Sequence, residues 1–528
     1  MSCGLDTGYG VSMVLLKWDR TPAEVWIYLG ILVFICLLYA FKDYIRILRF
    51  IFSLDGPVAL PVLGNANYVM RKDLLHIVSH NVYNDYGPIF RFWLTFLPYV
   101  TLLEPADIQC VLSSAKHTEK IFFYRLLDNF LGKGLITRDV VTWKGHRKIL
   151  QPAFHLHLLE RFTKSFSECA TNLMNKIINE GGRDVNITSF VNDSVYDILN
   201  ETVLGVTLAS GKNKQLDSDD DMPFRKGQVV APYRITRPWL LIEWIYQLTS
   251  IGRAEQKQRD ELFNACHKMM ERTRQNIMKN GSTITDSSQN AVKKISLLEF
   301  MVEISGKHPE FTDEDIINEC CTFMLAGQDS VGTATAMTLF LLANHQDWQR
   351  NCFEELEEIF GKDERSPTMK DFRDMKCLEM CIKETLRLFP PVPFFARTLG
   401  EDVVLGKQVI PAGCGVFIMP YATHRLAHHF PDPHTFNPQR FDPEVSNKMH
   451  PYAFLPFSAG PRNCIGNKFA MLEMKSMISA IIRKCHLGPV TGKEDIRPKF
   501  RLTVRAEGGL WVKITPRSEF RYQPYMNL

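Results

Sequence analysis

The sequence predicts a mainly helical protein with a small β region, and three observations support this class. Apolar residues recur at helical spacing through most of the chain. Two segments, 312–345 and Met375–Leu388, carry clear helix start or stop signals, and the second ends where Pro390 and Pro391 cannot continue a helix. A β-rich segment at 401–420, interrupted by glycine and proline, predicts a hairpin.

The segment 312–345 predicts a helix on the order of 50 Å long, enough to cross a whole domain. Thr312 is suited to cap it, and the acidic residues 313–315 favour the positive end of the helix dipole. Gly327 and Gly332 each weaken a helix by about 1 kcal/mol relative to alanine. We therefore expect another segment to approach this backbone closely, or the helix to bend there.

Composition excludes several classes of protein. The 528 residues are 45% hydrophobic and 23% charged with a net charge of +4, a balance too mild to indicate a nucleic-acid partner. Thirteen cysteines without regular spacing favour a reduced compartment over a secreted disulfide scaffold.

The N-terminal region predicts a membrane anchor. Val25–Phe41 is an uncharged apolar run that would form a helix of roughly 25 Å, close to the thickness of the endoplasmic reticulum bilayer, about 27 Å. Basic residues follow the run, which favours a body on the cytosolic face. A cleaved signal peptide is a weaker alternative because no small-residue cleavage site follows, and a buried core helix is weaker still. We expect residues 1–55 to be the anchor with its basic flank and residues 56–528 to form one catalytic domain.

Three further segments indicate connections. The segment 54–65, "LDGPVALPVLGN", predicts an extended, semi-rigid hinge after the anchor. The polar segments Ser210–Met222 and Asn280–Asn290 predict solvated loops rather than domain boundaries.

One cysteine has unusual surroundings. In "FLPFSAGPRNCIGNKFAMLEMK", residues 454–475, Cys464 lies in a stiff glycine-flanked loop beside Arg462 and just before an apolar helix pattern. Such a position stabilises a thiolate. A buried inert thiol is a weaker interpretation, and zinc is weaker again because no histidine or second cysteine lies nearby at zinc spacing. Two other cysteine pairs are interpreted as helix core: Cys320/Cys321 and Cys377/Cys381.

From the anchor to nearly the C-terminus the chain resembles the cytochrome P450 superfamily, and within it an insect-type member of family 4, the fatty-acid-hydroxylase branch. The likeness to family 4 rests on "LPFSAGPRNCIGNKFAMLEMK", "GLITRDVVTWKGHRKILQPAFH" and "TFM" at Thr322–Met324. The cysteine loop matches Phe-x-x-Gly-x-Arg-x-Cys-x-Gly at Phe457, Gly460, Arg462, Cys464 and Gly466. The resemblance implies the P450 fold and a heme b whose iron takes the Cys464 thiolate as axial ligand, which favours O–O cleavage.

The resemblance also assigns contacts to the haem propionates. Trp143 and Arg147 match the propionate-binding Trp-x-x-x-Arg motif, and Arg397 and Arg462 match two further partners. Arginine suits carboxylates because its planar fork donates two parallel bonds. A solvated helix face is the alternative for Arg147.

A structural network is implied behind the haem. Glu384 and Arg387 lie three residues apart on one helix face, a pattern that alone indicates only a surface ion pair. The resemblance joins them to Arg440 in a buried network that fixes the backbone presenting the cysteine.

On the long helix, "AGQDS" matches the family's acid–alcohol pair at Asp329 and Ser330, which would relay protons for oxygen activation. An ordinary helix carboxylate is the alternative for Asp329. The chain departs from the family at Ser330 and Val331, where threonine is usual. It also has Ala326 where many family 4 members have the glutamate that forms an ester to haem, so the sequence predicts a haem that is not ester-linked.

The implied enzyme is a monooxygenase of the endoplasmic reticulum membrane that inserts one oxygen atom from O2 into a C–H bond of an apolar substrate. Fatty acid, hydrocarbon, terpenoid and steroid all remain open. NADPH-derived electrons would come from the membrane-bound reductase, with cytochrome b5 as a second electron donor. A haem-thiolate sensor and a haem isomerase or dehydratase are the rival classes.

Two groups of residues follow from this interpretation. Candidates for the acidic partner's docking surface flank the haem motifs: Lys144, His146, Lys148 and Lys468. Candidates for the substrate pocket, with core packing as the equal alternative, are Phe323, Met324, Val392, Phe394 and Phe395.

Overall fold

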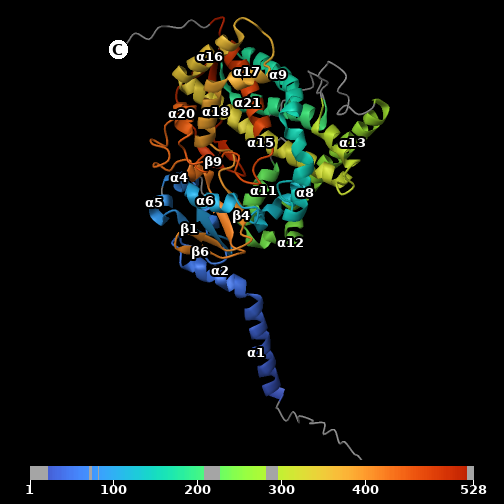
Figure 1. Cartoon of the computed structure of the whole chain (residues 1–528), viewed down its shortest axis with the longest axis vertical. Coiled ribbons are helices and arrows are strands. Elements are labelled where there is room, and N and C mark those ends of the chain that lie inside the picture. Colours follow the sequence, from blue (N-terminus) through green and yellow to red (C-terminus); the bar gives the residue numbers. More distant parts are fainter. Residues whose placement is uncertain (1–21, 70–73, 81, 207–225, 281–294, 520–528) are drawn as a thin grey trace, which may run out of the picture.

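The helical class predicted from the sequence is confirmed by the computed structural model, in which helices make up most of the body and several strands lie toward the end that bears the N-terminal helices (Figure 1). The structure describes residues 22–69, 74–80, 82–206, 226–280 and 295–519. The two predicted polar loops lie outside these residues, except for Asn280, which ends a helix.

The longer helices form most of the body. They are α8 (Val140–Leu150), α9 (Leu156–Ile178), α10 (Ile187–Leu199), α11 (Lys226–Ile235), α13 (Ser250–Asn280), α14 (Leu297–Ser305), α15 (Asp313–Asn344), α16 (Gln346–Phe360), α18 (Lys376–Leu388) and α21 (Asn467–Lys484). Shorter helices are α3 (Ala66–Val69), α4 (Leu74–His80), α5 (Val82–Tyr86), α6 (Pro105–Leu112), α7 (Asp128–Leu131), α12 (Glu243–Gln247), α17 (Met369–Asp374), α19 (Pro420–Thr423) and α20 (Pro443–Ser446).

Within the described residues, the strands form four small sheets. The largest has the order β1 (Ile89–Leu94), β2 (Leu97–Leu102), β7 (Gly415–Ile418), β4 (Phe395–Thr398), and only its β2–β7 pair is parallel. A second has the order β3 (Asp184–Asn186), β11 (Trp511–Pro516), β8 (Cys485–Pro489). Two hairpins pair β5 (Val403–Leu405) with β6 (Gln408–Ile410) and β9 (Pro498–Phe500) with β10 (Val504–Ala506).

The hairpin predicted at 401–420 therefore forms only in its first half. The turn after β6, at Pro411–Gly413, redirects the chain, and Gly413 has the positive φ of 79° that this turn requires. Strand β7 then joins the four-stranded sheet instead of continuing the hairpin.

Helix α15 is continuous and begins where the sequence predicts. Thr312 and Asp315 form a capping box, in which the Thr312 Oγ accepts from the Asp315 N–H and the Asp315 carboxylate accepts from the Thr312 N–H. A Cβ at Gly327 would lie 2.7 Å from Cδ2 of Leu199, and one at Gly332 would lie 2.5 Å from Oδ1 of Asn192. Both glycines therefore allow α10 to lie directly against α15, which is the close approach that the sequence predicts.

The main core lies where α9, α10, α15, α18 and α21 meet. Helices α9 and α21 interlock through aromatic edges: the Phe469 ring lies 5.7 Å from Phe162 and 4.9 Å from Phe166, centroid to centroid. This packing fixes α21, and therefore the loop that precedes it.

The N-terminal helices differ in their surroundings. Helix α1 (Pro22–Ala40) extends away from the body, with Trp26–Cys36 exposed (Figure 1). Helix α2 (Lys42–Phe52) instead packs on the body through Ile47 and Ile51. Within the described part of the chain, no helix has both the length and the apolarity that crossing a membrane requires, so the predicted span is not found in the structure.

Candidate active site

The cysteine loop is held by the backbone on both sides of Cys464. The Cys464 N–H donates to the Phe457 carbonyl at 2.9 Å, and Gly466 is the cap residue of α21. Gly460 has a φ of 74°, and a Cβ there would lie 1.7 Å from the Leu112 carbonyl oxygen. Only glycine fits at this point, so the loop is locked against α6.

Two opposing influences act on the Cys464 thiol. Burial raises its pKa, while a hydrogen bond from the Gly466 N–H and the positive charge of Arg147 lower it. The latter two are the interactions that stabilise a thiolate. Cys464 is surrounded by protein but, unlike most cysteines in the described part of the chain, keeps exposed surface, so it faces a space within the body.

Arg147 is attached directly to the cysteine loop. On α8, its guanidinium donates to the Asn463 carbonyl and to the Asn463 side chain, both at 2.8 Å. Trp143 is buried one turn earlier, with the Arg462 guanidinium 4.8 Å from its ring centroid. The structure therefore brings Trp143, Arg147 and Arg462 together beside Cys464, and Arg147, although partly exposed, is hydrogen-bonded to the cysteine loop.

Arg397 and Arg462 join this group as buried cations. Arg462 donates to the Thr118 and Arg138 carbonyls, each at 2.6 Å, and Arg397 donates to the Arg462 carbonyl at 3.4 Å. Among the described residues, neither forms an ion pair with a carboxylate, and the buried Arg462 Nε has no hydrogen-bond partner.

Lys120 was not predicted from the sequence. Burial, together with the charges of Arg397 and Arg462, holds its pKa well below the usual range. Burial followed by the Arg397 charge lowers the pKa of Arg462 to about 10. Negatively charged groups bound between Lys120, Arg397 and Arg462 would relieve the repulsion among these three cations. The two propionate groups of a haem fit these hydrogen-bond donors.

The Glu384, Arg387 and Arg440 side chains also meet. The Arg387 guanidinium donates two bonds of 2.7 Å to the Glu384 carboxylate, and Arg440 Nε lies 3.5 Å from the same carboxylate. Glu384 and Arg387 are fully buried. The remaining donors of Arg387 bind the carbonyls of His424, Pro433 and Thr435 and so hold the segment that leads to the cysteine loop.

His424 connects this network to the cysteine loop and was missed in the sequence. Its Nε2 accepts from the Leu455 N–H at 2.8 Å, and its Nδ1 lies 3.3 Å from the Arg387 carbonyl. Burial first, and the Arg387 charge second, lower the pKa of His424 to about 3. The ring is therefore a neutral bridge between α18 and the segment that precedes Cys464.

Helix α15 has an opening on one face. Its residues are almost all buried, yet Ala326 is exposed and Gly327 and Ser330 are partly exposed. Because these positions are three and four apart, they share one helix face, which therefore lines a space. The Ser330 Oγ donates to the Ala326 carbonyl at 2.7 Å.

No hydrogen bond connects the Asp329 carboxylate to the Ser330 hydroxyl, although both residues lie within the described part of the chain. The carboxylate is buried, pairs with Arg505 of β10 and accepts from the Thr503 hydroxyl. Neither partner was predicted, because both lie in a C-terminal segment without a recognisable motif.

The five candidate pocket residues do not form one group. Phe323 and Met324 are buried in the main core, where Phe323 packs against Phe154 at 5.5 Å between ring centroids. Phe394 stacks on Phe500 at 4.5 Å, and Phe395 belongs to the core around α2. Val392 is 42% exposed. Core packing therefore describes Met324 best, whereas Phe323 lies one turn from the open face of α15.

His146 is buried, which corrects its assignment to a docking surface. It lies on the inner face of α8, 3.2 Å from Arg138 Nη1 and 3.5 Å from the Glu319 carboxylate. Lys144, Lys148 and Lys468 are exposed as predicted. Lys144 and Lys148 border a surface hollow of about 380 Å³ that also includes Arg147 and Pro461.

A mainly helical body, a cysteine loop at a helix start and a group of buried cations that fits two propionates together define a haem-thiolate protein. Comparison with known families gives the same class: residues 54–512 match the family model described as Cytochrome P450. The chain belongs to the cytochrome P450 family, as an insect-type member of family 4.

Similar proteins come from insects and mammals. The chain is 48% identical to "Probable cytochrome P450 4aa1" of Drosophila melanogaster, over 90% of this chain and 92% of that protein. It is 37% identical to "Cytochrome P450 4c3" of the same organism, over 94% and 95% respectively. It is 32% identical to "Cytochrome P450 4V2" of Mus musculus, over 87% and 89%. Membership makes this chain a P450 monooxygenase, whose family carries a haem bound by a cysteine thiolate.

Proposed function

We propose that this monooxygenase inserts one oxygen atom from O2 into a C–H bond of a lipid or similar apolar substrate, with NADPH-derived electrons from a membrane-bound reductase and cytochrome b5 as a second donor. The observation that carries the proposal is the cysteine loop, in which Cys464 lies beside the buried cations Arg397 and Arg462. When bound, a thiolate-ligated haem supplies the O2 activation.

In this proposal the Cys464 thiolate would bind the haem iron. The Gly466 N–H and the Arg147 charge would favour negative charge on its sulfur against the effect of burial, and the locked turn at Gly460 holds the loop in place. Trp143, Arg147, Arg397 and Arg462 would hold the propionates, and Phe457 and Gly466 shape the loop. Glu384, Arg387 and Arg440 have a positioning role, because their contacts end on the backbone that leads to the loop.

Ser330 and Asp329 would handle protons on the open face of α15. The Ser330 Oγ is partly exposed there and can pass a proton onward by rotating away from the Ala326 carbonyl. Asp329 is oriented by Arg505 and Thr503, so a water molecule between the two residues would complete the relay.

The substrate end of the site is proposed to lie beside Phe323, with Val392 and Phe394 at its outer side. Apolar side chains of this kind exclude water and bind hydrocarbon without directional contacts. The haem is proposed to be held without an ester, because Ala326 offers only a methyl group on the open face of α15. Acid extraction under denaturing conditions should therefore remove all haem from the polypeptide.

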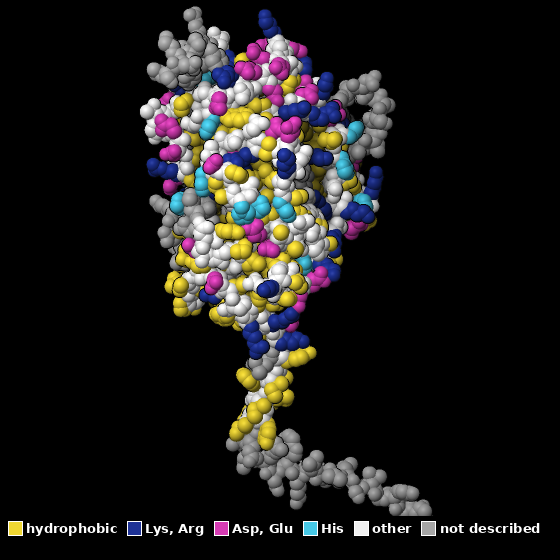
Figure 2. All heavy atoms as spheres, turned by 60° about the vertical axis from the view of Figure 1, so that its left-hand side comes forward, with side chains coloured by type: hydrophobic (Ala, Val, Ile, Leu, Met, Phe, Trp, Pro, Cys, Tyr) yellow, Lys and Arg dark blue, Asp and Glu magenta, His cyan; other side chains and the backbone are white. Residues whose placement is uncertain are grey.

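Attachment to the endoplasmic reticulum membrane through α1, with the body on the cytosolic face, is also a proposal. The exposed apolar side chains of α1 support it, and Figure 2 shows Lys and Arg side chains where this apolar helix meets the body. Full-length protein should stay in the membrane pellet after alkaline carbonate extraction, and removal of residues 1–41 should release it. Extraction of the full-length protein by carbonate would contradict the anchor.

The Cys464 assignment is tested by spectroscopy. The reduced carbon monoxide complex should show the band diagnostic of thiolate ligation, and Cys464→Ser should lose it while Cys485→Ser retains it. Oxygenated product with NADPH consumption in the presence of reductase would separate a monooxygenase from a haem sensor or isomerase. A thiolate band that persists in Cys464→Ser would overturn the assignment.

A further inference from the structure

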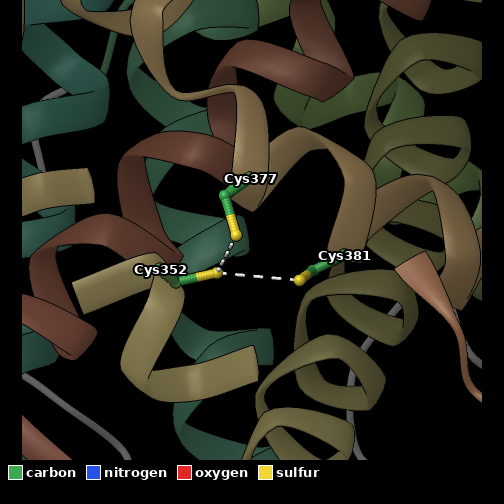
Figure 3. A group of neighbouring side chains, drawn as sticks. All are labelled: Cys352, Cys377 and Cys381. Atoms are coloured by element: carbon green, nitrogen blue, oxygen red, sulfur yellow. Dashed lines mark hydrogen bonds between the residues drawn. The ribbon is translucent and has the colours of Figure 1, made fainter. Parts of the chain in front are cut away.

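Three cysteine thiols other than Cys464 meet between two helices (Figure 3). Cys352 comes from α16, and Cys377 and Cys381 lie four residues apart on one face of α18. The Cys352 sulfur is 3.7 Å from that of Cys377 and 3.6 Å from that of Cys381. Cys352 and Cys381 are buried, and Cys377 is half-buried.

The spacing of the sulfurs matches that of metal-bound thiolates. A zinc ion with Zn–S bonds of about 2.3 Å in tetrahedral geometry places its sulfurs roughly 3.8 Å apart. The two sulfur–sulfur distances measured from Cys352 are close to this value, and the three sulfur atoms all lie within 4.8 Å of one another. All three side chains point toward one central position (Figure 3).

The surroundings favour negative charge on one of these sulfurs. Cys377 is the second residue of α18, where the N-terminal end of the helix dipole stabilises a thiolate. A position that favours a thiolate reduces the cost of metal binding.

The Glu355 carboxylate on α16 lies beside this group, but its oxygens already accept hydrogen bonds from backbone N–H groups and are not counted as metal ligands. It accepts from the Cys377 N–H at 2.6 Å and from the Leu378 N–H at 3.1 Å, and so caps the start of α18. Cys377 is half-buried, so the group of three thiols is not wholly enclosed.

We propose that Cys352, Cys377 and Cys381 bind one zinc ion through three thiolates, with water as the fourth ligand. Three S–Zn bonds form and three thiol protons pass to solvent, without electron transfer, which leaves the site with a charge of −1. The start of α18 offsets that charge.

The proposed ion would act on the fold rather than on the substrate. It ties α16 to the first turns of α18, and the last turn of the same helix carries Glu384 and Arg387. Zinc binding therefore stabilises the helix that supports the haem network. Cys381 lies in the main core and Cys377 packs against it, as the sequence predicts, so the ion would add a metal-binding role to these core positions.

Zinc content of the haem-loaded, full-length protein tests the proposal. The protein is reduced, treated with a chelator, incubated with Zn²⁺ and desalted, and zinc is measured per haem iron. Wild type should hold about one more zinc than Cys352→Ala, Cys377→Ser or Cys381→Ser. Cadmium should give an ultraviolet sulfur-to-metal band in wild type and not in these three variants, which excludes uptake by histidines.

Cys266→Ser is the matched control, because Cys266 and Cys321 form a buried pair of sulfurs 3.9 Å apart. Within the described part of the chain, the neighbouring Cys320 does not complete a group of three ligand atoms with them. This variant should bind zinc and cadmium as wild type does. Equal zinc in wild type and Cys377→Ser would overturn the proposal, as would a disulfide between Cys352 and either partner, found by mass spectrometry, in protein purified under reducing conditions. Cys377→Ser changes a half-buried residue, so it remains informative if a core variant does not fold.

Discussion

His424 shows how a single buried side chain can couple a distant network to the haem loop. Its two nitrogens face different segments, Leu455 on one side and Arg387 on the other. Both contacts depend on a neutral ring with its proton on Nδ1, because the Leu455 N–H needs an acceptor. A positive charge on this ring would be repelled by the positive charge of the buried Arg387.

This arrangement predicts a pH-dependent contribution of His424 to stability. Its folded pKa of about 3 lies below the ordinary value of 6.5, so the contribution is complete above pH 6.5 and is lost as the pH falls toward 3. His424→Leu should lower the free energy of unfolding by about 1–3 kcal/mol at neutral pH, because it leaves the Leu455 N–H unpaired. Urea unfolding followed by tryptophan fluorescence should show that the difference shrinks as the pH falls. A difference that is constant with pH would contradict the neutral bridge.

Glu473, in contrast to His424, is a buried ionisable group whose side chain forms no hydrogen bond among the described residues. It is fully buried on α21, and neither of its oxygens has a hydrogen-bond partner among the described residues. Burial raises its pKa well above the usual value. The folded state therefore binds a proton that the unfolded state releases above about pH 4.5, and stability is lost as the pH rises.

Glu473→Leu should consequently stabilise the protein by about 1–3 kcal/mol at neutral pH and by less at pH 4. Thermal unfolding at the two pH values measures the gain. Glu384→Leu is the contrasting control: it should destabilise strongly, because it leaves the buried Arg387 without its carboxylate. A loss of stability in Glu473→Leu would show that the carboxyl has a stabilising partner.

At the scale of elements, α10 and α15 explain the glycines of the long helix. The Leu199 side chain occupies the position that a Cβ at Gly327 would need. A Cβ there costs steric strain, whereas alanine in a free helix gains about 1 kcal/mol over glycine. The two effects can be separated by changing both residues.

Gly327→Ala alone should destabilise by about 1–3 kcal/mol. In a Leu199→Ala background the same change should be neutral or stabilising by up to about 1 kcal/mol, because the clash is absent and the helix propensity remains. Urea midpoints of the four proteins in this cycle give the coupling energy. Additive effects would mean that α10 does not restrict Gly327.

The ends of helices were predictable because their signals are local. The capping box at Thr312 and the prolines after α18 lie next to the boundaries they set. The partner of Asp329 was not predictable, because Thr503 is 174 residues away and reaches α15 only through the fold. The burial of His146 was not predicted either, because the fold decides which face of α8 turns inward. Lys144 and His146 are two residues apart and lie on different faces of this helix.

At the scale of the whole molecule, the basic residues beside the cysteine loop form a surface suited to an electron donor. Lys144 and Lys148 project from α8 at a hollow that also includes Arg147, which contacts the loop directly. Lys468 is exposed on the first turn of α21. An acidic partner that docks here would lie on the side of the protein that carries the Cys464 loop, and attraction between opposite charges would steer its approach.

The double variant Lys144→Glu, Lys148→Glu should therefore raise the reductase concentration needed for half-maximal turnover by about tenfold, because both changes replace attraction by repulsion. The effect should diminish at high salt, since exposed charges are screened. Lys268→Glu, an equal change of charge on α13, should leave the reductase dependence unchanged. Turnover driven by an organic hydroperoxide, which needs no reductase, should be the same in all three proteins. If the double variant loses this turnover as well, or if Lys268→Glu weakens reductase use equally, the surface around the hollow is not the docking site.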